Sequence, residues 1–164
     1  MKKNEDVNAP VQEENTPYVI ETDPQYNIPT EELLKLFPVT YQTPALTKME
    51  QNVQNRMLNG FNRWNMGYAA WSSRAEEFYT EDAVCTYKDK ELTVSQLKEV
   101  MKPIIASTRR VRINNILVSE NWTAVHYWDV TTLEDGTEDV ANHMQFLRFA
   151  EDGDGVKVDL CWAC

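Results

Sequence analysis

Two histidines carry the acid–base chemistry that this sequence could perform. The chain contains only His126 and His143. Imidazole has an ordinary pKa of about 6.5, so it can both accept and donate a proton near neutrality. Cyclisation, enol isomerisation and β-elimination all require a proton to be removed beside a carbonyl group and the resulting oxyanion to be stabilised. We therefore expect His126 to be the general base or acid, and His143 to relay the proton or position the substrate.

The turn between the histidines decides which face of a sheet each one occupies. Asp135-Gly136 is a strong signal for a two-residue hairpin turn. Centring the turn there pairs His126 with Gln145, and residues paired across an antiparallel ladder share a face. The same count puts His143 on that face, so both imidazoles are predicted to project from one side. A turn longer or shorter by one residue would instead set Asp129 beside His143.

Other side chains could complete a pocket around the histidines. Gln145 and Tyr87 are expected to donate hydrogen bonds to an oxyanion. Indole and phenol rings would supply flat apolar walls for a ring-shaped substrate. The candidates for these walls are Trp64, Tyr68, Trp71, Trp128 and Trp162. A buried histidine can equally serve a structural hydrogen bond, so non-catalytic ligand binding stays open as the alternative.

Four helices are predicted, three of them before the first strand. A short helix lies between Pro29 and Pro38. A long helix begins at the capping-box pattern of Thr47 and Glu50 and runs for about six turns. Its apolar stripe consists of Met49, Val53, Met57, Phe61, Trp64, Tyr68 and Trp71. A second capping-box pattern, Ser73 to Glu76, predicts a short helix through Tyr79, and the last helix starts at Thr93, after the first strand.

The rest of the chain is predicted to be strand. The strands cover residues 82–87, 110–119, the hairpin on either side of Asp135-Gly136, and 156–162, where Val158, Leu160 and Trp162 share one side. Helices followed by consecutive strands predict an α+β fold, with long N-terminal helices in the concavity of a strongly curved antiparallel or mixed sheet. Residues 1–28 are expected to form an extended acidic arm, 29–46 a short helix and connector, and 47–164 the domain.

Composition narrows the class of partner. The 164 residues carry a formal charge of −10, which disfavours nucleic acid and anionic membranes. No apolar run is long enough to span a bilayer, and no secretory signal is recognisable, so a cytoplasmic protein is expected. Cys161 and Cys164 form a CxxC pattern, but neither a following helix nor a second ligand pair accompanies it. We expect ordinary strand-end cysteines, no metal and no cofactor.

Residues 77–84, EFYTEDAV, are similar to the helix-to-strand signature of the SnoaL-like branch of the nuclear transport factor 2-like, or cystatin-like, superfamily. The helix from Thr93 and the order of the terminal strands, ending at Trp162, strengthen the resemblance, which covers Thr47 to Cys164. The resemblance implies a cone-shaped α+β barrel. The family includes polyketide cyclases, ketosteroid isomerase and scytalone dehydratase, and also proteins that only bind ligands or act as scaffolds.

The resemblance carries over only to some residues. Tyr87 falls at the pocket tyrosine of scytalone dehydratase, His126 at one of its histidines, and His143 at or beside its pocket asparagine. Gln145 falls at the oxyanion-hole aspartate of ketosteroid isomerases, whose base has no counterpart here. The resemblance thus implies a cyclase-, dehydratase- or isomerase-like enzyme acting on a small apolar or aromatic ligand, or alternatively a dimeric scaffold.

The outer face of the sheet is the expected oligomer interface. Its predicted apolar residues are Val125, Tyr127, Met144 and Phe146. Such a face is too apolar to be left in water, and family members often dimerise through it, so a homodimer is expected.

Overall fold

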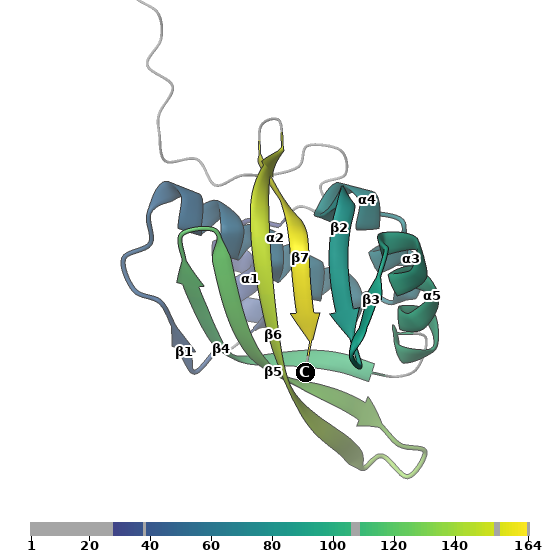
Figure 1. The fold of residues 1–164 in the computed structure, drawn as a ribbon. Helices are drawn as coiled ribbons and strands as arrows, with labels where there is room; N and C mark the ends of the chain where they lie inside the picture. Colours follow the sequence, from purple (N-terminus) through teal and green to yellow (C-terminus); the bar gives the residue numbers. More distant parts are fainter. Residues whose placement is uncertain (1–27, 38, 106–108, 153–154, 164) are drawn as a thin grey trace, which may run out of the picture.

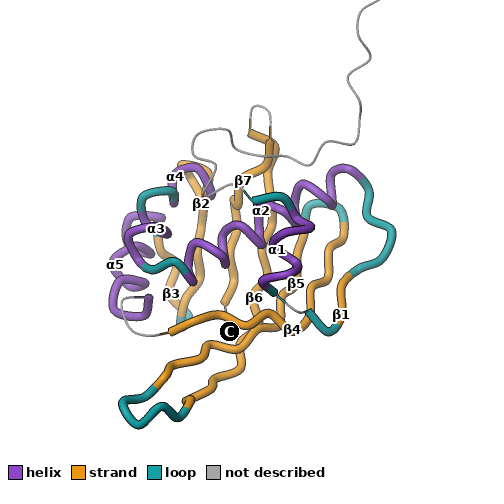
Figure 2. The backbone as a smooth tube through the Cα atoms, turned by 180° about the vertical axis from the view of Figure 1, so that it is seen from behind, coloured by secondary structure: helices purple, strands orange, loops and turns teal. Residues whose placement is uncertain are grey.

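The computed structural model describes residues 28–37, 39–105, 109–152 and 155–163. These residues form five helices and seven strands, with the helices gathered against one side of a curved sheet (Figures 1 and 2). The arm predicted for residues 1–28 lies outside the described residues, apart from Ile28. None of the described helices has the length and apolar character needed to cross a membrane.

Helix α1, Thr30–Leu36, is short and buries Leu33 against the core. Two asparagines of helix α2, Lys48–Asn65, bind the backbone just before α1. Asn59 Oδ1 accepts a hydrogen bond from the Ile28 N–H at 3.0 Å, and its Nδ2 donates to the Ile28 carbonyl at 3.1 Å. Asn55 Nδ2 donates to the same carbonyl at 3.2 Å. Side chains of α2 thus replace the backbone partners that Ile28 lacks.

Helix α2, Lys48–Asn65, begins with the predicted capping box between Thr47 and Glu50. Its predicted continuation to Trp71 is wrong. The helix ends at Asn65 with Met66 as its C-cap, and Gly67 takes a φ of +105°, which an α-helix does not accommodate. The chain then restarts as α3, Tyr68–Ser72. Glycine tolerates this left-handed conformation without steric cost, so it separates the two helices.

A buried arginine joins α2 to elements at two distant points of the chain. Helix α4 covers Ala75–Phe78, and strand β7 covers Gly155–Ala163. Arg56, 3% exposed, donates from Nε to the Val156 carbonyl at 2.9 Å and from Nη2 to the Glu77 carbonyl at 2.6 Å.

Helix α5, Val94–Ile105, begins as predicted at Thr93, whose hydroxyl accepts from the Gln96 N–H at 3.3 Å.

The sheet is mixed and open. Its strands follow the order β1-β4-β5-β6-β7-β2-β3, with β1 and β3 at the edges. Pairs β1–β4 and β2–β7 are parallel, and the others are antiparallel. The remaining strands are β1 Tyr41–Gln42, β2 Tyr79–Tyr87, β3 Lys90–Leu92, β4 Arg109–Ser119, β5 Trp122–Thr132 and β6 Glu138–Asp152. The α+β prediction with a curved mixed sheet is confirmed, but the sheet does not close into a barrel.

The predicted register of the β5–β6 hairpin is wrong by one residue. Tyr127 pairs with His143, and His126 pairs with Met144. Of the two residues predicted to centre the turn, only Gly136 takes a positive φ, 82°, whereas a type I′ turn needs one at both. The Asp135 carboxylate instead accepts hydrogen bonds from the N–H and hydroxyl of Thr137. This loop is wider than the predicted turn, so the pairing shifts by one residue. The side chains of one strand therefore exchange faces relative to the prediction.

Two bulges also change which side chains face inward. In β4 the pairing shifts between Ile113 and Asn115, so the buried residues change from Val111 and Ile113 to Ile116 and Val118. In β7 the pairing skips Asp159, which places Val158 and Cys161 inside. A bulge inserts one unpaired residue and thereby reverses the alternation beyond it. The prediction that Val158 and Trp162 share a side is therefore wrong.

Candidate functional site

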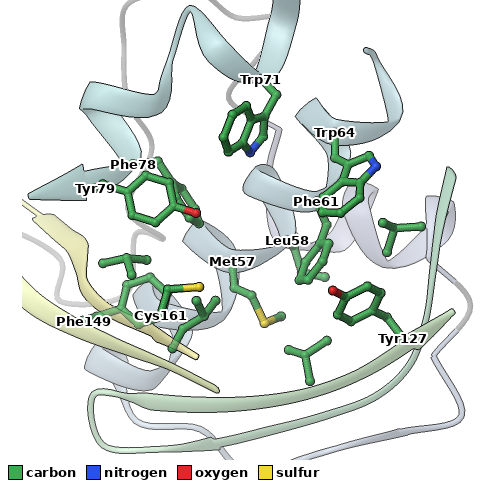
Figure 3. Close-up of a cluster of buried hydrophobic side chains, with 14 of the residues drawn as sticks. Met57, Leu58, Phe61, Trp64, Trp71, Phe78, Tyr79, Tyr127, Phe149 and Cys161 are labelled. Atoms are coloured by element: carbon green, nitrogen blue, oxygen red, sulfur yellow. The ribbon is translucent and has the colours of Figure 1, made fainter. Parts of the chain in front are cut away.

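A cavity of about 540 Å³ lies between the helices and the inner face of the sheet. Helices α2, α3, α4 and α5 all contribute to its walls, as do strands β2, β5, β6 and β7. Its aromatic lining includes Phe61, Trp64, Trp71, Phe78, Tyr79 and Tyr127 (Figure 3). The Tyr127 ring lies 5.1 Å from that of Phe61 and 6.4 Å from that of Trp64. A mostly apolar cavity with few polar groups is the usual form of a small-molecule site.

A carboxylate and an imidazole meet on the cavity wall. Asp129 and His143 project from β5 and β6 onto the inner face, and Asp129 Oδ2 lies 4.0 Å from His143 Nε2. The His143 ring stacks on Tyr127, with centroids 5.4 Å apart and planes at 26°. The Asp129 side chain is 8% exposed and that of His143 35%. The carboxylate therefore faces the imidazole from a nearly buried position, while the ring stays accessible from the cavity.

Other side chains that can donate hydrogen bonds line the same cavity. Gln145 lies two residues after His143, on the same face, and its Nε2 donates to Cys161 Sγ at 3.0 Å. Tyr87, near the end of β2, also lines the cavity. Burial is the main cause that raises the pKa of the Tyr127 hydroxyl, followed by the nearby Cys161 and Asp129. Tyr127 thus stays protonated and can donate a hydrogen bond.

His126 lies on the opposite face of the sheet. Its Nδ1 is 3.0 Å from Asn114 Nδ2, and its ring meets the edge of Trp128 at a centroid distance of 6.2 Å. His126 does not line the cavity. The prediction that both imidazoles share one face is therefore wrong, because a shift of one residue in register moves His126 outward.

The predicted aromatic walls are only partly brought together. Trp64 and Trp71 line the cavity. Tyr68 packs against Trp71 and donates from its hydroxyl to the Lys98 carbonyl at 3.1 Å, outside the cavity lining. Trp128 lies with His126 on the outer face. Trp162 borders the cavity, but it pairs with Phe146 and is 55% exposed.

The outer face also differs from the prediction. Val125 and Tyr127 are buried, at 0% and 4% exposure, and point to the inside. Met144 is 45% exposed and remains on the outer face. Sequence reasoning missed the inward position of Tyr127, although the alternative register, with Asp129 beside His143, contained the signal for it.

The described residues contain no cluster of side chains that could ligate a metal ion. Within residues 28–37, 39–105, 109–152 and 155–163, no group of three or more histidine, cysteine, aspartate or glutamate side chains is placed to hold an ion. Cys164, the second cysteine of the CxxC pattern, lies outside those ranges.

Comparisons with known proteins give structural matches only. No family model matches the sequence, and no curated protein matches it. A proposed SnoaL-like polyketide cyclase from Jannaschia sp. CCS1 matches with a TM-score of 0.60 at 12% identity, over 74% of this chain and 90% of that one. AclR, a proposed hydroxylase from Streptomyces galilaeus, matches with a TM-score of 0.58 at 18% identity, over 70% and 89%.

A third match is a proposed aromatic ring hydroxylase from Novosphingobium aromaticivorans, with a TM-score of 0.58 at 14% identity, over 73% of this chain and 90% of that one. Identities this low establish shared architecture and leave the activity to be argued from the site. With its helices set against a curved mixed sheet, the chain has the fold of the SnoaL-like, nuclear transport factor 2-like superfamily.

Proposed function

We propose that the cavity binds a ring-shaped, mostly apolar carbonyl compound and catalyses acid–base chemistry beside the carbonyl, as a cyclase, dehydratase or isomerase would. The observation that carries this proposal is the position of His143, held between the Asp129 carboxylate and the Tyr127 ring on the cavity wall. His143 takes the acid–base role that the sequence suggested for His126. The structural neighbours described as polyketide cyclases support the same class of substrate.

Each polar group has a role in this proposal. His143 removes a proton from the carbon beside the carbonyl, and Asp129 stabilises the imidazolium that forms. Gln145 has two amide protons and gives one to Cys161, so a second remains for an oxyanion. Tyr87 lies on the same cavity and can donate its hydroxyl proton. Donors that are already in place stabilise the developing negative charge without reorganising.

Proton abstraction can be tested without knowing the natural substrate. The probe is 2-tetralone, a bicyclic ketone, dissolved in D₂O, and the readout is deuterium exchange beside its carbonyl, followed by NMR. The protein should accelerate this exchange. His143→Asn should slow it by about 10²–10⁴-fold, the usual contribution of a general base. His126→Asn is the matched control, because its ring lies outside the cavity.

The two histidine variants separate the possible outcomes. Equal exchange by wild type and His143→Asn would refute the role of His143. Loss of exchange in His126→Asn alone would restore the assignment made from the sequence. Both variants should keep the circular dichroism spectrum of the wild type, since neither ring belongs to the buried core.

Non-catalytic binding is the second candidate, and the aromatic lining favours it. Trp64 and Trp71 both line the cavity. A ligand that packs on these indoles would quench their fluorescence in a saturable manner. Saturable quenching by 2-tetralone without accelerated exchange would support a binding protein in place of an enzyme.

We also propose that the chain forms a homodimer through the outer face of the sheet. Leu117, Met144 and Trp162 are 49%, 45% and 55% exposed there. Large apolar side chains exposed together usually mark an interaction surface. Light scattering should give the mass of a dimer, and Met144→Glu should shift it to that of a monomer. A wild-type monomer at all concentrations would contradict this proposal.

A further inference from the structure

Two buried thiols lie directly opposite each other on the cavity wall. Cys85 of β2 pairs with Cys161 of β7 in the parallel ladder, and both line the cavity. Both are free cysteines, with exposures of 1% and 4%. Neighbouring strands lie about 4.7–4.9 Å apart, which falls within the Cα separations of about 4.4–6.8 Å that disulfides span. The backbone therefore already holds these two residues at a bridging distance.

The two sulfur atoms have different environments. The two thiols influence each other's ionisation, so only one of them ionises at a time. The Gln145 amide, whose Nε2 lies 3.0 Å from Cys161 Sγ, also lowers the pKa of Cys161. Burial works against ionisation at both sites. The hydrogen bond from Gln145 favours a thiolate on Cys161, which makes Cys161 the better nucleophile. Cys85 lies opposite it and is positioned to attack the oxidised sulfur.

The cavity supplies a route for a small reagent. Its walls are mainly apolar and aromatic (Figure 3), and its volume of about 540 Å³ lies within the range of small-molecule sites. Cys161 lies on the inner face of β7, which faces α2 and the aromatic lining. An apolar oxidant is therefore favoured over a charged one at these thiols.

We propose that Cys85 and Cys161 form a cavity-facing dithiol that an apolar organic hydroperoxide oxidises to a disulfide. The sulfur of Cys161 attacks the terminal oxygen of the hydroperoxide. The O–O bond breaks, the alcohol leaves with a proton, and Cys161 becomes a sulfenic acid. The sulfur of Cys85 then attacks that of Cys161, the S–O bond breaks, and water leaves with the Cys85 proton. Two thiols and one hydroperoxide thus give a disulfide, an alcohol and water.

This dithiol does not depend on the acid–base proposal, since neither His143 nor Asp129 takes part in it. Gln145 contacts both sites, but it gives only one of its two amide protons to Cys161. It also differs from the CxxC pattern in the sequence, because the partner of Cys161 comes from a strand far away along the chain. Cys164 could compete for Cys161, so the experiment uses a Cys164→Ser protein, in which Cys85 and Cys161 are unchanged.

The folded Cys164→Ser protein is treated with equimolar cumene hydroperoxide. Remaining thiols are blocked with N-ethylmaleimide, and the digested protein is analysed by mass spectrometry. We expect a cross-linked peptide pair joining Cys85 to Cys161, with the loss of two hydrogens. Adding Gln145→Leu should slow cross-linking by about tenfold, the effect of a thiol pKa higher by one unit. Adding Cys85→Ala should leave a sulfenic acid on Cys161, which dimedone captures.

The proposal can be refuted in a protein that carries no core substitution. It is wrong if both thiols of the folded Cys164→Ser protein stay free under conditions in which the urea-unfolded protein is oxidised. A Cys161 that gives no dimedone adduct in the Cys85→Ala protein would equally refute the assigned order of attack.

Discussion

Replacing Arg56 with methionine tests how much its hydrogen bonds stabilise the fold around the cavity. The guanidinium donates to the carbonyls of Val156 and Glu77, and so ties α2 to the start of β7 and the end of α4. A hydrogen bond that involves a charged group contributes about 1.5–3 kcal/mol, so losing two removes roughly 3–6 kcal/mol. Methionine has a similar length and carries no charge. The cost of removing the guanidinium from water therefore disappears, which offsets part of that loss. We expect a net destabilisation of about 2–4 kcal/mol.

Thermal and urea unfolding, followed by circular dichroism, would measure this loss. A change of 1 kcal/mol shifts the Tm of a chain of this size by about 3 °C, so Arg56→Met should lower Tm by roughly 6–12 °C. Arg56→Lys should fall between wild type and Arg56→Met. An ammonium group lacks the planar fork that reaches two carbonyls at once.

Arg112→Met is the matched control for the same chemical change. Arg112 donates to Glu138 at 2.6 Å, but its side chain is 49% exposed. Such a surface ion pair contributes at most about 1 kcal/mol. The reasoning fails if Arg56→Met is as stable as the wild type or more stable, since burying the guanidinium would then cost more than its two hydrogen bonds return.

Three further changes test other contacts. Thr47→Ala removes the cap of α2 and should cost about 1 kcal/mol in urea unfolding. Glu50 accepts hydrogen bonds from the Thr47 N–H, the Glu120 N–H and the Thr47 hydroxyl, which hold its pKa below the ordinary value of 4.5. Its contribution is therefore present above that value and lost as pH falls through the lowered pKa, so Glu50→Gln should flatten the stability profile in acid. Asn59→Leu removes two hydrogen bonds to Ile28 and should cost about 2 kcal/mol.

Each of these predictions has a contrary outcome. An unchanged urea midpoint for Thr47→Ala would mean that solvent caps α2 equally well. A steeper acid profile for Glu50→Gln would reverse the sign of the argument. The control for Asn59→Leu is Asn142→Leu on an exposed part of β6, which should change stability by less than about 0.5 kcal/mol. Equal effects of the two leucine substitutions would show that the contacts with Ile28 add nothing.

Local patterns in the sequence were enough to predict the α+β class and where two of the helices begin. The capping boxes at Thr47 and Thr93 join residues three positions apart, so their geometry does not depend on the rest of the fold. The end of α2 was missed because its apolar stripe continues past Gly67 into α3. A periodic pattern cannot show that a glycine between two helices takes a positive φ.

Which side chains line the cavity, by contrast, depends on the pairing register of several strands. A wider turn around Asp135, an extra residue near Asn114 and another at Asp159 each reverse the faces of a strand. Strand side chains alternate with a period of two, so each shift of one residue moves a side chain from one face to the other.

The sequence by itself therefore determined which chemical groups the chain offers, because two histidines and a set of aromatic rings are readable from residue types. Only the tertiary structure decided which of them meet. It moved His126 to the outer face, set Asp129 beside His143 and brought Cys85 opposite Cys161. These outcomes depend on strand register, and register is determined by loop conformation and bulges that the alternating pattern does not encode.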